Sequence, residues 1–358
     1  MLERRQIMVR SALNIVTVVA VFLLLYWLQA AGIMGSHQST VVVTIGINVI
    51  MAVSLNMVTG VLGQLTLGHA GFMSIGAYAA ALLTKSLPWP IMVSLPVGLL
   101  FGGIIAAAFG MLIGIPALRL RGDYLAIITL AFGEIIRIAI NNLGFTGGAK
   151  GLRGIPMLNP MPKFTIIYVC AIVTIFVIVL VIRSRQGRAI ISIREDQIAS
   201  EACGIDSTRY KLMAFTIGAF FAGVAGGLYA HHLGVLEAKN FGFNKSVEIV
   251  VMVVMGGMGS TTGSVIAATL LSILPEGLRS LKSIPGLAQA VPFLADEARD
   301  PRMVIYSLLL VLIMIFLPKG LAGLWNRREF SIYGIVQWIK AKANGRAKKT
   351  EHTDEKGA

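Results

Sequence analysis

A glutamate and an arginine stand three residues apart in the apolar stretch AFGEIIRIAINN. If this stretch is helical, Glu134 and Arg137 lie on one face and can form an ion pair, because residues three apart are neighbours on a helix. An unpaired charge at membrane depth is costly, so the two side chains are expected to pair or to face a wet cavity. A structural pair that fixes helix packing is the alternative to contact with a substrate. Asn141 marks the outer end of this helix.

Two glycine-rich segments occupy matching places in the two halves of the chain. They are GVLGQLTLGHAGFMSIGAY at residues 60–78 and GGMGSTTGSVIAA at residues 256–268. Interrupted hydrophobic segments at corresponding positions are typical of a translocation path, because their free backbone groups must line a cavity or be buried in protein. Close helix packing through small residues is the alternative. Gln64 and His69 favour a lined path, since polar side chains at membrane depth need partners.

The spacing of the remaining polar residues argues against several kinds of chemistry. A phosphate-binding loop requires G-x-x-x-x-G-K-[ST], and GGMGSTTGS lacks both the spacing and the lysine. No paired aspartates and no HExxH-like element occur within a predicted span, and His69, His231 and His232 lack metal-ligand spacing. We therefore predict no catalytic residue, metal or cofactor in this chain, which disfavours an intramembrane enzyme. Any ATP hydrolysis must occur in another chain.

The elements that must position these residues are membrane-spanning helices. The 358 residues are 56% hydrophobic and only 13% charged, whereas soluble domains have roughly 25% charged residues. This composition predicts an all-α integral membrane protein with about ten transmembrane helices, in a range of about eight to ten. The candidate spans are 11–31, 41–59, 66–84, 91–115, 124–140, 164–182, 211–232, 247–258, 264–281 and 303–317. The eighth is short enough to be a half-helix, and the first is interpreted as a retained helix and not as a signal peptide.

The distribution of basic residues predicts the orientation of these helices. With the N-terminus inside, 20 of the 31 Lys and Arg residues fall on the cytoplasmic side and ten on the other side, as the positive-inside rule favours. Both termini are therefore expected in the cytoplasm, although Lys150, Arg153 and Lys163 run against the bias. The net charge of +14 suits the anionic inner leaflet of a lipid bilayer and requires no nucleic acid. A transmembrane domain over residues 1–325 and a basic cytoplasmic tail over 326–358 follow from this arrangement.

The most charged internal stretch, residues 187–211, lies on the predicted cytoplasmic side. Its spacing predicts one amphipathic helix with four apolar residues on a single face: Ile191, Ile198, Ala202 and Ile205. Gly204 is expected to end this helix, and Asp206 or Ser207 to cap the next one. Such a helix is either a connector at the membrane surface or a docking element for a cytoplasmic partner.

Three long motifs in the chain resemble the M-type permease subunit of bacterial branched-chain amino-acid ABC transporters. They are GQLTLGHAGFMSIGAYAAAL, then LRLRGDYLAIITLAFGEIIRIAINN followed by TGG, and finally GRAIISIREDQIASEACGI. The resemblance spans about residues 48–324, in the order of the family. It implies a non-catalytic subunit of an ATP-driven importer for leucine, isoleucine and valine. Urea and short-chain amide permeases are similar in the same motifs and remain an alternative.

The resemblance also implies partners, a location and an architecture. The partners are a second, H-type permease subunit, two cytoplasmic ATPase subunits that bind ATP and Mg, and an extracytoplasmic substrate-binding protein. The location is the bacterial cytoplasmic (inner) membrane, which the chain would cross many times. The architecture is similar to that of vitamin B12-type ABC importer permeases. An ion-coupled secondary transporter, with Glu134 as a proton or Na⁺ site, is the alternative from another class.

Together these inferences give two candidate sites. The residues predicted to line the translocation path are Gln64, His69, Glu134, Arg137 and Asn141. By resemblance, the EAxG element within residues 187–211 is similar to the EAA loop that docks in the ATPase groove, although it is shortened from the EAA-x3-G form. The residues predicted to form this ATPase-coupling site are Arg194, Glu195, Asp196, Glu201, Ala202 and Gly204.

Overall fold

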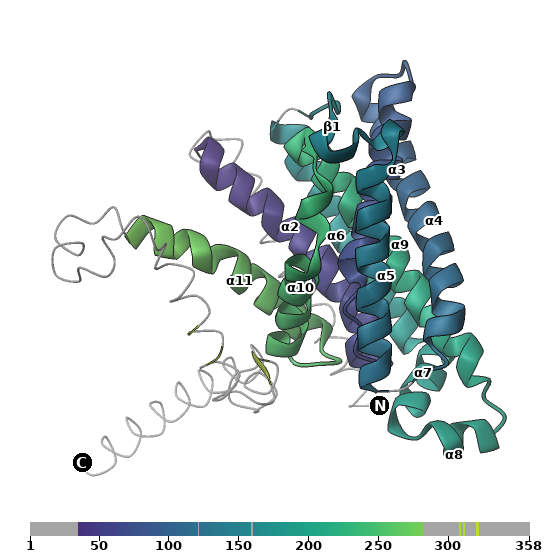
Figure 1. The fold of residues 1–358 in the computed structure, drawn as a ribbon. Helices are drawn as coiled ribbons and strands as arrows, with labels where there is room; N and C mark the ends of the chain where they lie inside the picture. The colour runs from purple at the N-terminus through teal and green to yellow at the C-terminus, as the bar shows by residue number, and fades with distance from the viewer. Residues whose placement is uncertain are drawn as a thin grey trace, which may run out of the picture.

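A computed structural model describes residues 35–120, 122–158 and 160–281, with residues 308, 311, 320 and 321. The first and tenth predicted spans, the basic tail and Arg121 lie outside the described residues, apart from 308 and 311 in the tenth. The described chain is helical (Figure 1), with eight helices that coincide with predicted spans: α2 (Ser36–Asn56), α3 (His69–Ser86), α4 (Ile91–Ala117), α5 (Asp123–Asn142), α6 (Pro160–Arg183), α9 (Ser207–Leu233), α10 (Phe243–Gly256) and α11 (Thr261–Leu281).

Four segments of this bundle are long and apolar enough to cross a membrane by themselves. They are residues 37–61, 91–117, 163–183 and 207–233. By contrast, α10 has 14 residues, which gives a length of roughly 21 Å at 1.5 Å per residue, against about 30 Å of hydrocarbon. The prediction of a short eighth segment is therefore confirmed.

The centre of the bundle is held together by small residues. Helix α3 packs against α4 and α9, and a Cβ on Gly76 of α3 would lie only 2.2 Å from the Cα of Gly223 in α9. A Cβ on Gly226 of α9 would likewise lie 1.9 Å from the backbone oxygen of Met73. Lipid tails are as apolar as leucine, so helices in a membrane gain stability mainly from such close van der Waals contact. Glycine at these positions allows the backbones to touch.

The connections gather at two opposite ends of the bundle (Figure 1). At one end, strand β1 (Leu152–Arg153) follows α5 and pairs antiparallel with β2 (Val235–Leu236), which follows α9. Three short 3₁₀ turns flank these strands: Gly144–Thr146, Gly148–Lys150 and Ala238–Phe241. At the other end lie the short helices α7 (Arg185–Glu195) and α8 (Gln197–Ala202).

The prediction of one amphipathic helix in residues 187–211 was wrong, because the chain breaks at Asp196. This residue has an extended backbone (φ −154°, ψ 111°), and its Oδ1 accepts a hydrogen bond from the Ala199 N–H at 3.0 Å. Aspartate is a preferred N-cap, so it ends α7 and starts α8. Ile191 and Ile198 consequently belong to different helices. The buried face of α7 consists of Gly187, Ile190 and Ile193.

The expected ends of these elements were placed correctly. Gly204, two residues after the end of α8, has a positive φ of 83°, which is a conformation that glycine adopts without strain. Asp206 caps α9, because its Oδ1 accepts a hydrogen bond from the Arg209 N–H at 3.1 Å.

Candidate functional site

The pair in α5 forms as predicted and also supports another helix. Arg137 Nε donates to Glu134 Oε2 at 2.7 Å, and the two side chains are 32% and 33% exposed. The second oxygen, Oε1, accepts from the N–H of Phe243 at 3.1 Å. Phe243 is the first residue of α10, so the carboxylate satisfies a free donor at a helix N-terminus, where negative charge is favourable. Glu134 and Phe243 are 109 positions apart, and no local pattern in the sequence indicates their contact.

His69 and Gln64 lie near the opposite end of α3 from the β1 loops. His69 begins α3, is 3% exposed, and its Nε2 lies 2.8 Å from Ser54 Oγ of α2. Gln64 is in the loop between α2 and α3, and its buried Oε1 has no hydrogen-bond partner among the described residues. The partner of His69 was missed, because Ser54 sits in a continuous apolar run and gives no signal of its own.

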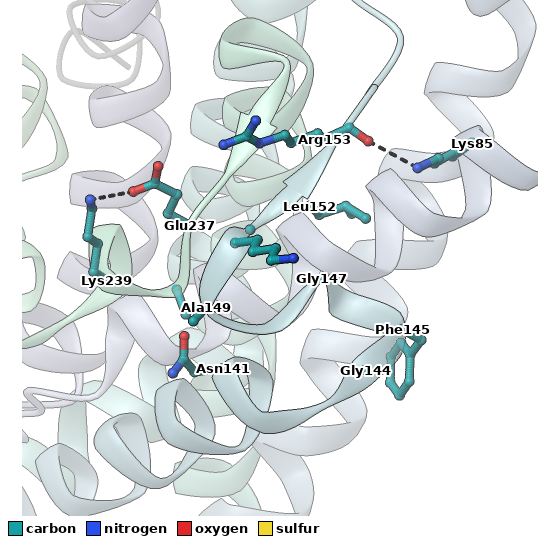
Figure 2. A pocket seen from close by; sticks show the side chains of 13 residues that line it. Lys85, Asn141, Gly144, Phe145, Gly147, Ala149, Leu152, Arg153, Glu237 and Lys239 are labelled. Carbon is teal, nitrogen blue, oxygen red and sulfur yellow. Dashed lines mark hydrogen bonds and ion pairs between the residues drawn. The ribbon is translucent and has the colours of Figure 1, made fainter.

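Asn141 lies at the β1 end, where it lines a pocket of about 650 Å³ (Figure 2). Charged residues surround this pocket: Lys85, Lys150, Arg153, Glu237 and Lys239. Lys85 Nζ donates to the backbone oxygen of Arg153 at 3.0 Å, and Lys239 pairs with Glu237 at 2.6 Å. Lys150 and Arg153, two of the basic residues that depart from the positive-inside distribution, thus lie in this loop cluster.

The predicted path residues therefore do not form one site. Glu134 and Arg137 lie within α5, Asn141 lies at its outer end, and Gln64 and His69 lie where α3 begins. Of these five residues, Glu134 and Arg137 are joined by a hydrogen bond.

The predicted coupling residues share one corner of the bundle, formed by α7 and α8. Glu195 pairs with Arg194, and its side chain is 67% exposed. Glu201 is instead engaged within the corner, where Ser207 Oγ and Gln197 Nε2 both donate to its carboxylate. Ile198 and Ala202, four residues apart on α8, are exposed, with Ile198 at 71%. The corner thus presents an apolar helix surface and a carboxylate.

The two glycine-rich segments meet each other. Gly60 lies in η1 (Met57–Val61), a five-residue π-helix that ends α2, and Gly259 lies in the turn after α10. The Gly259 N–H donates to Asn56 Oδ1 at 2.9 Å, and a Cβ on Gly60 would lie 2.1 Å from the Gly259 nitrogen. Close packing, the alternative for these segments, is therefore present at this contact.

Comparison with known proteins identifies the chain. Residues 38–317 match the family described as "Branched-chain amino acid transport system / permease component". The chain belongs to this family. It is thus a multi-pass membrane permease of a bacterial transport family and the permease component of a branched-chain amino-acid transport system, as its motifs predict.

Relatives of this permease cover most of its length. The chain is 36% identical to the high-affinity branched-chain amino acid transport system permease protein LivM of Salmonella typhimurium, over 77% of this chain and 67% of the relative. It is 26% identical to the LivH permease protein of the same organism, over 76% and 90%. A probable LivM permease of Methanocaldococcus jannaschii is 25% identical, over 74% and 80%. No solved structure matches the chain.

Proposed function

We propose that this permease is one transmembrane half of an ATP-driven importer of leucine, isoleucine and valine. A second, H-type permease subunit would form the other half. Two cytoplasmic ATPase subunits would bind ATP and Mg, and an extracytoplasmic binding protein would deliver the amino acid. The match of residues 38–317 to the permease family carries the proposal. The similarity to both LivM and LivH supports a pair of related permeases.

The proposed topology has ten transmembrane helices with both termini in the cytoplasm, in the bacterial inner membrane, similar to vitamin B12-type permeases. Residues 1–325 would form the permease domain and 326–358 a basic cytoplasmic tail. The positions of α7–α8 and of β1 at opposite ends of the bundle support this orientation (Figure 1). The loop cluster around β1 would then face the binding protein, and the α7–α8 corner would face the ATPase.

The proposed translocation path passes along the exposed edge of α5, where Glu134 and Arg137 lie. Ile135 and Ile138 on the same helix are 58% and 51% exposed. An ion pair that is one-third exposed is costly against lipid, so this edge is expected to be covered by the second permease or by the wet path. Asn141 at the outer end, and Gln64 and His69 near the inner end, are proposed along the same route.

The proposed coupling contact is the α7–α8 corner. An exposed apolar helix surface flanked by charges suits docking into a groove on a partner, with the charges fixing the register. Ile198 and Ala202 would enter the ATPase groove, and Glu195 would lie at its rim. Gly204 allows the sharp turn from α8 into α9.

Reconstitution tests the proposal. Proteoliposomes that contain this chain, an H-type permease and both ATPases, with the binding protein added on the outside, are expected to accumulate leucine when ATP is inside. Liposomes with this chain alone are expected to show neither ATP hydrolysis nor accumulation. Concentrative uptake by the lone chain under an ion gradient would favour the secondary transporter. Uptake of urea or a short-chain amide in preference to leucine would identify the chain as a subunit of a urea or amide importer.

A further inference from the structure

One arginine of the α7–α8 corner reaches into the contact between the two glycine-rich segments. Arg194, in the last turn of α7, donates from Nη1 to the backbone oxygen of Gly60 at 3.1 Å, across 134 residues of sequence. A Cβ on Gly259 would lie 3.3 Å from the same Nη1. The guanidinium therefore touches a segment from each half of the chain.

The aliphatic part of the Arg194 side chain is also closely packed against a glycine. Gly63, two residues after η1, has a φ of 77°, and a Cβ there would lie 2.5 Å from Arg194 Cγ. Gly63 thus leaves room for the arginine stem by lacking a side chain. Long arginine stems gain stability by covering apolar or backbone surface in this way.

The other side of the guanidinium is held at the surface. Glu195 Oε1 accepts from Arg194 Nη2 at 2.5 Å and from Nε at 3.1 Å. Hydrogen bonds between ionised groups are roughly twice as strong as those between neutral groups. A rigid, planar guanidinium can hold a surface carboxylate and a backbone oxygen at the same time, which the single ammonium of a lysine does less well.

Arg194 docks where a π-helical turn meets a glycine-rich turn. Its acceptor belongs to η1, a π-helical turn, and such turns inside α-helices occur frequently at functional sites. The neighbouring turn at Gly257–Gly259 has two glycines with positive φ, 95° and 85°. The two residues that meet, Gly60 and Gly259, have no side chains, and Asn56 and Arg194 supply side-chain hydrogen bonds to their backbones.

We infer that Arg194 is a positioning residue that transmits movement of α7–α8 to the contact between Gly60 and Gly259. Glu195 receives the displacement at the surface and Arg194 carries it to the ends of α2 and α10. This inference rests on the proposed docking of the ATPase at the α7–α8 corner. Arg194 contacts no substrate; its effect is to make the two glycine-rich segments move with the corner.

The test measures leucine uptake and ATP hydrolysis on the same proteoliposomes, with the complete transporter and binding protein. For Arg194→Gln, we expect the ATPase subunits to copurify normally and ATP to be hydrolysed, while leucine imported per ATP falls about tenfold, as for the loss of a charge-assisted hydrogen bond. Arg194→Lys keeps the charge and is expected to recover part of this ratio. Arg185→Gln, at an exposed arginine on the same helix, is the matched control and is expected to keep the wild-type ratio.

Each other outcome decides between the inference and its alternatives. An unchanged uptake-to-hydrolysis ratio in Arg194→Gln would overturn the inference, and loss of the ATPase from the purified complex would make Arg194 a docking residue instead. If Arg194→Gln does not accumulate in the membrane, Glu195→Gln provides the test, with a ratio about twofold to threefold lower expected from one weakened surface pair. A wild-type ratio in Glu195→Gln would then overturn the inference. Failure of the wild-type complex to import leucine would count against the proposed function alone.

Discussion

Two basic residues at the α7–α8 end of the bundle, Arg194 and Lys211, hydrogen-bond to neighbouring elements, whereas several basic residues at the β1 end surround an open pocket. Arg194 donates to Gly60 and Lys211 Nζ donates to Gln197 Oε1 at 2.8 Å, so these cations fix the positions of helices. Lys150 and Arg153 instead line a pocket of about 650 Å³, where Arg153 lies beside Lys85 (Figure 2). Arg194 and Lys211 thus serve the internal geometry of their end, whereas the side chains of Lys150 and Arg153 are exposed and available to a partner.

The largest expected effect concerns which side of the membrane each end faces. Cys203 is exposed beside α8, and Phe145 is 64% exposed beside β1. A membrane-impermeant maleimide is expected to label Cys203 in inside-out vesicles only. Phe145→Cys, made in a Cys203→Ser chain, is expected to label in right-side-out vesicles only. Labelling of both cysteines from the same side would contradict the assignment of the two ends to opposite faces.

A large effect is also expected where backbones touch at the α7–α8 end. Gly60→Ala places a Cβ 2.1 Å from the Gly259 nitrogen, and overpacking of this kind costs about 1–3 kcal/mol or more. We expect it to abolish leucine uptake or to prevent accumulation of the protein. Gly144→Ala, at the β1 end, is the control, because its Cβ would meet no described atom within 4 Å. Equal tolerance of both changes would mean that the contact between Gly60 and Gly259 can accommodate a methyl group.

An intermediate effect is expected on α5, which runs between the two ends. Glu134→Gln and Arg137→Met each leave one charge of the pair without its partner, and uptake is expected to fall several-fold. Breaking a fully buried pair costs roughly 3–5 kcal/mol, and partial exposure makes the cost smaller here. Glu134→Gln is expected to be the more damaging change, because the carboxylate also caps α10. The double variant should recover part of the loss, whereas additive damage would indicate independent roles.

The smallest effect is expected in the β1 pocket. If Lys150 and Arg153 steer an acidic partner surface, changing both to glutamine should raise the binding-protein concentration needed for half-maximal uptake a few-fold at low salt. The effect should disappear above about 0.5 M salt, since exposed charges are screened. Leucine uptake measured against binding-protein concentration at two ionic strengths checks this. A loss that persists at high salt would mean that these cations fix loop structure, as Arg194 fixes the other end.

Local features were predictable from the sequence, and long-range contacts were not. Glu134 and Arg137 are one helical turn apart, so their pairing follows from spacing alone. The contact from Arg194 to Gly60 spans 134 residues and ends on a backbone oxygen, which every residue type possesses. The apolar periodicity of residues 187–211 predicts a single amphipathic helix, but the side chain of Asp196 caps α8 and divides the segment into two helices. The π-helical turn at Gly60 has no sequence signal beyond the glycine itself.

The small residues at the centre of the bundle also limit how the permease can be re-engineered. Where Gly76 of α3 meets Gly223 of α9, any larger side chain on either helix would require the other backbone to retreat. Variation that adapts the protein to new partners must therefore accumulate at its two ends and on the edge of α5. A chimaera built from two such permeases should accordingly exchange α3, α4 and α9 together, with the crossover points before α3, after α4 and on either side of α9.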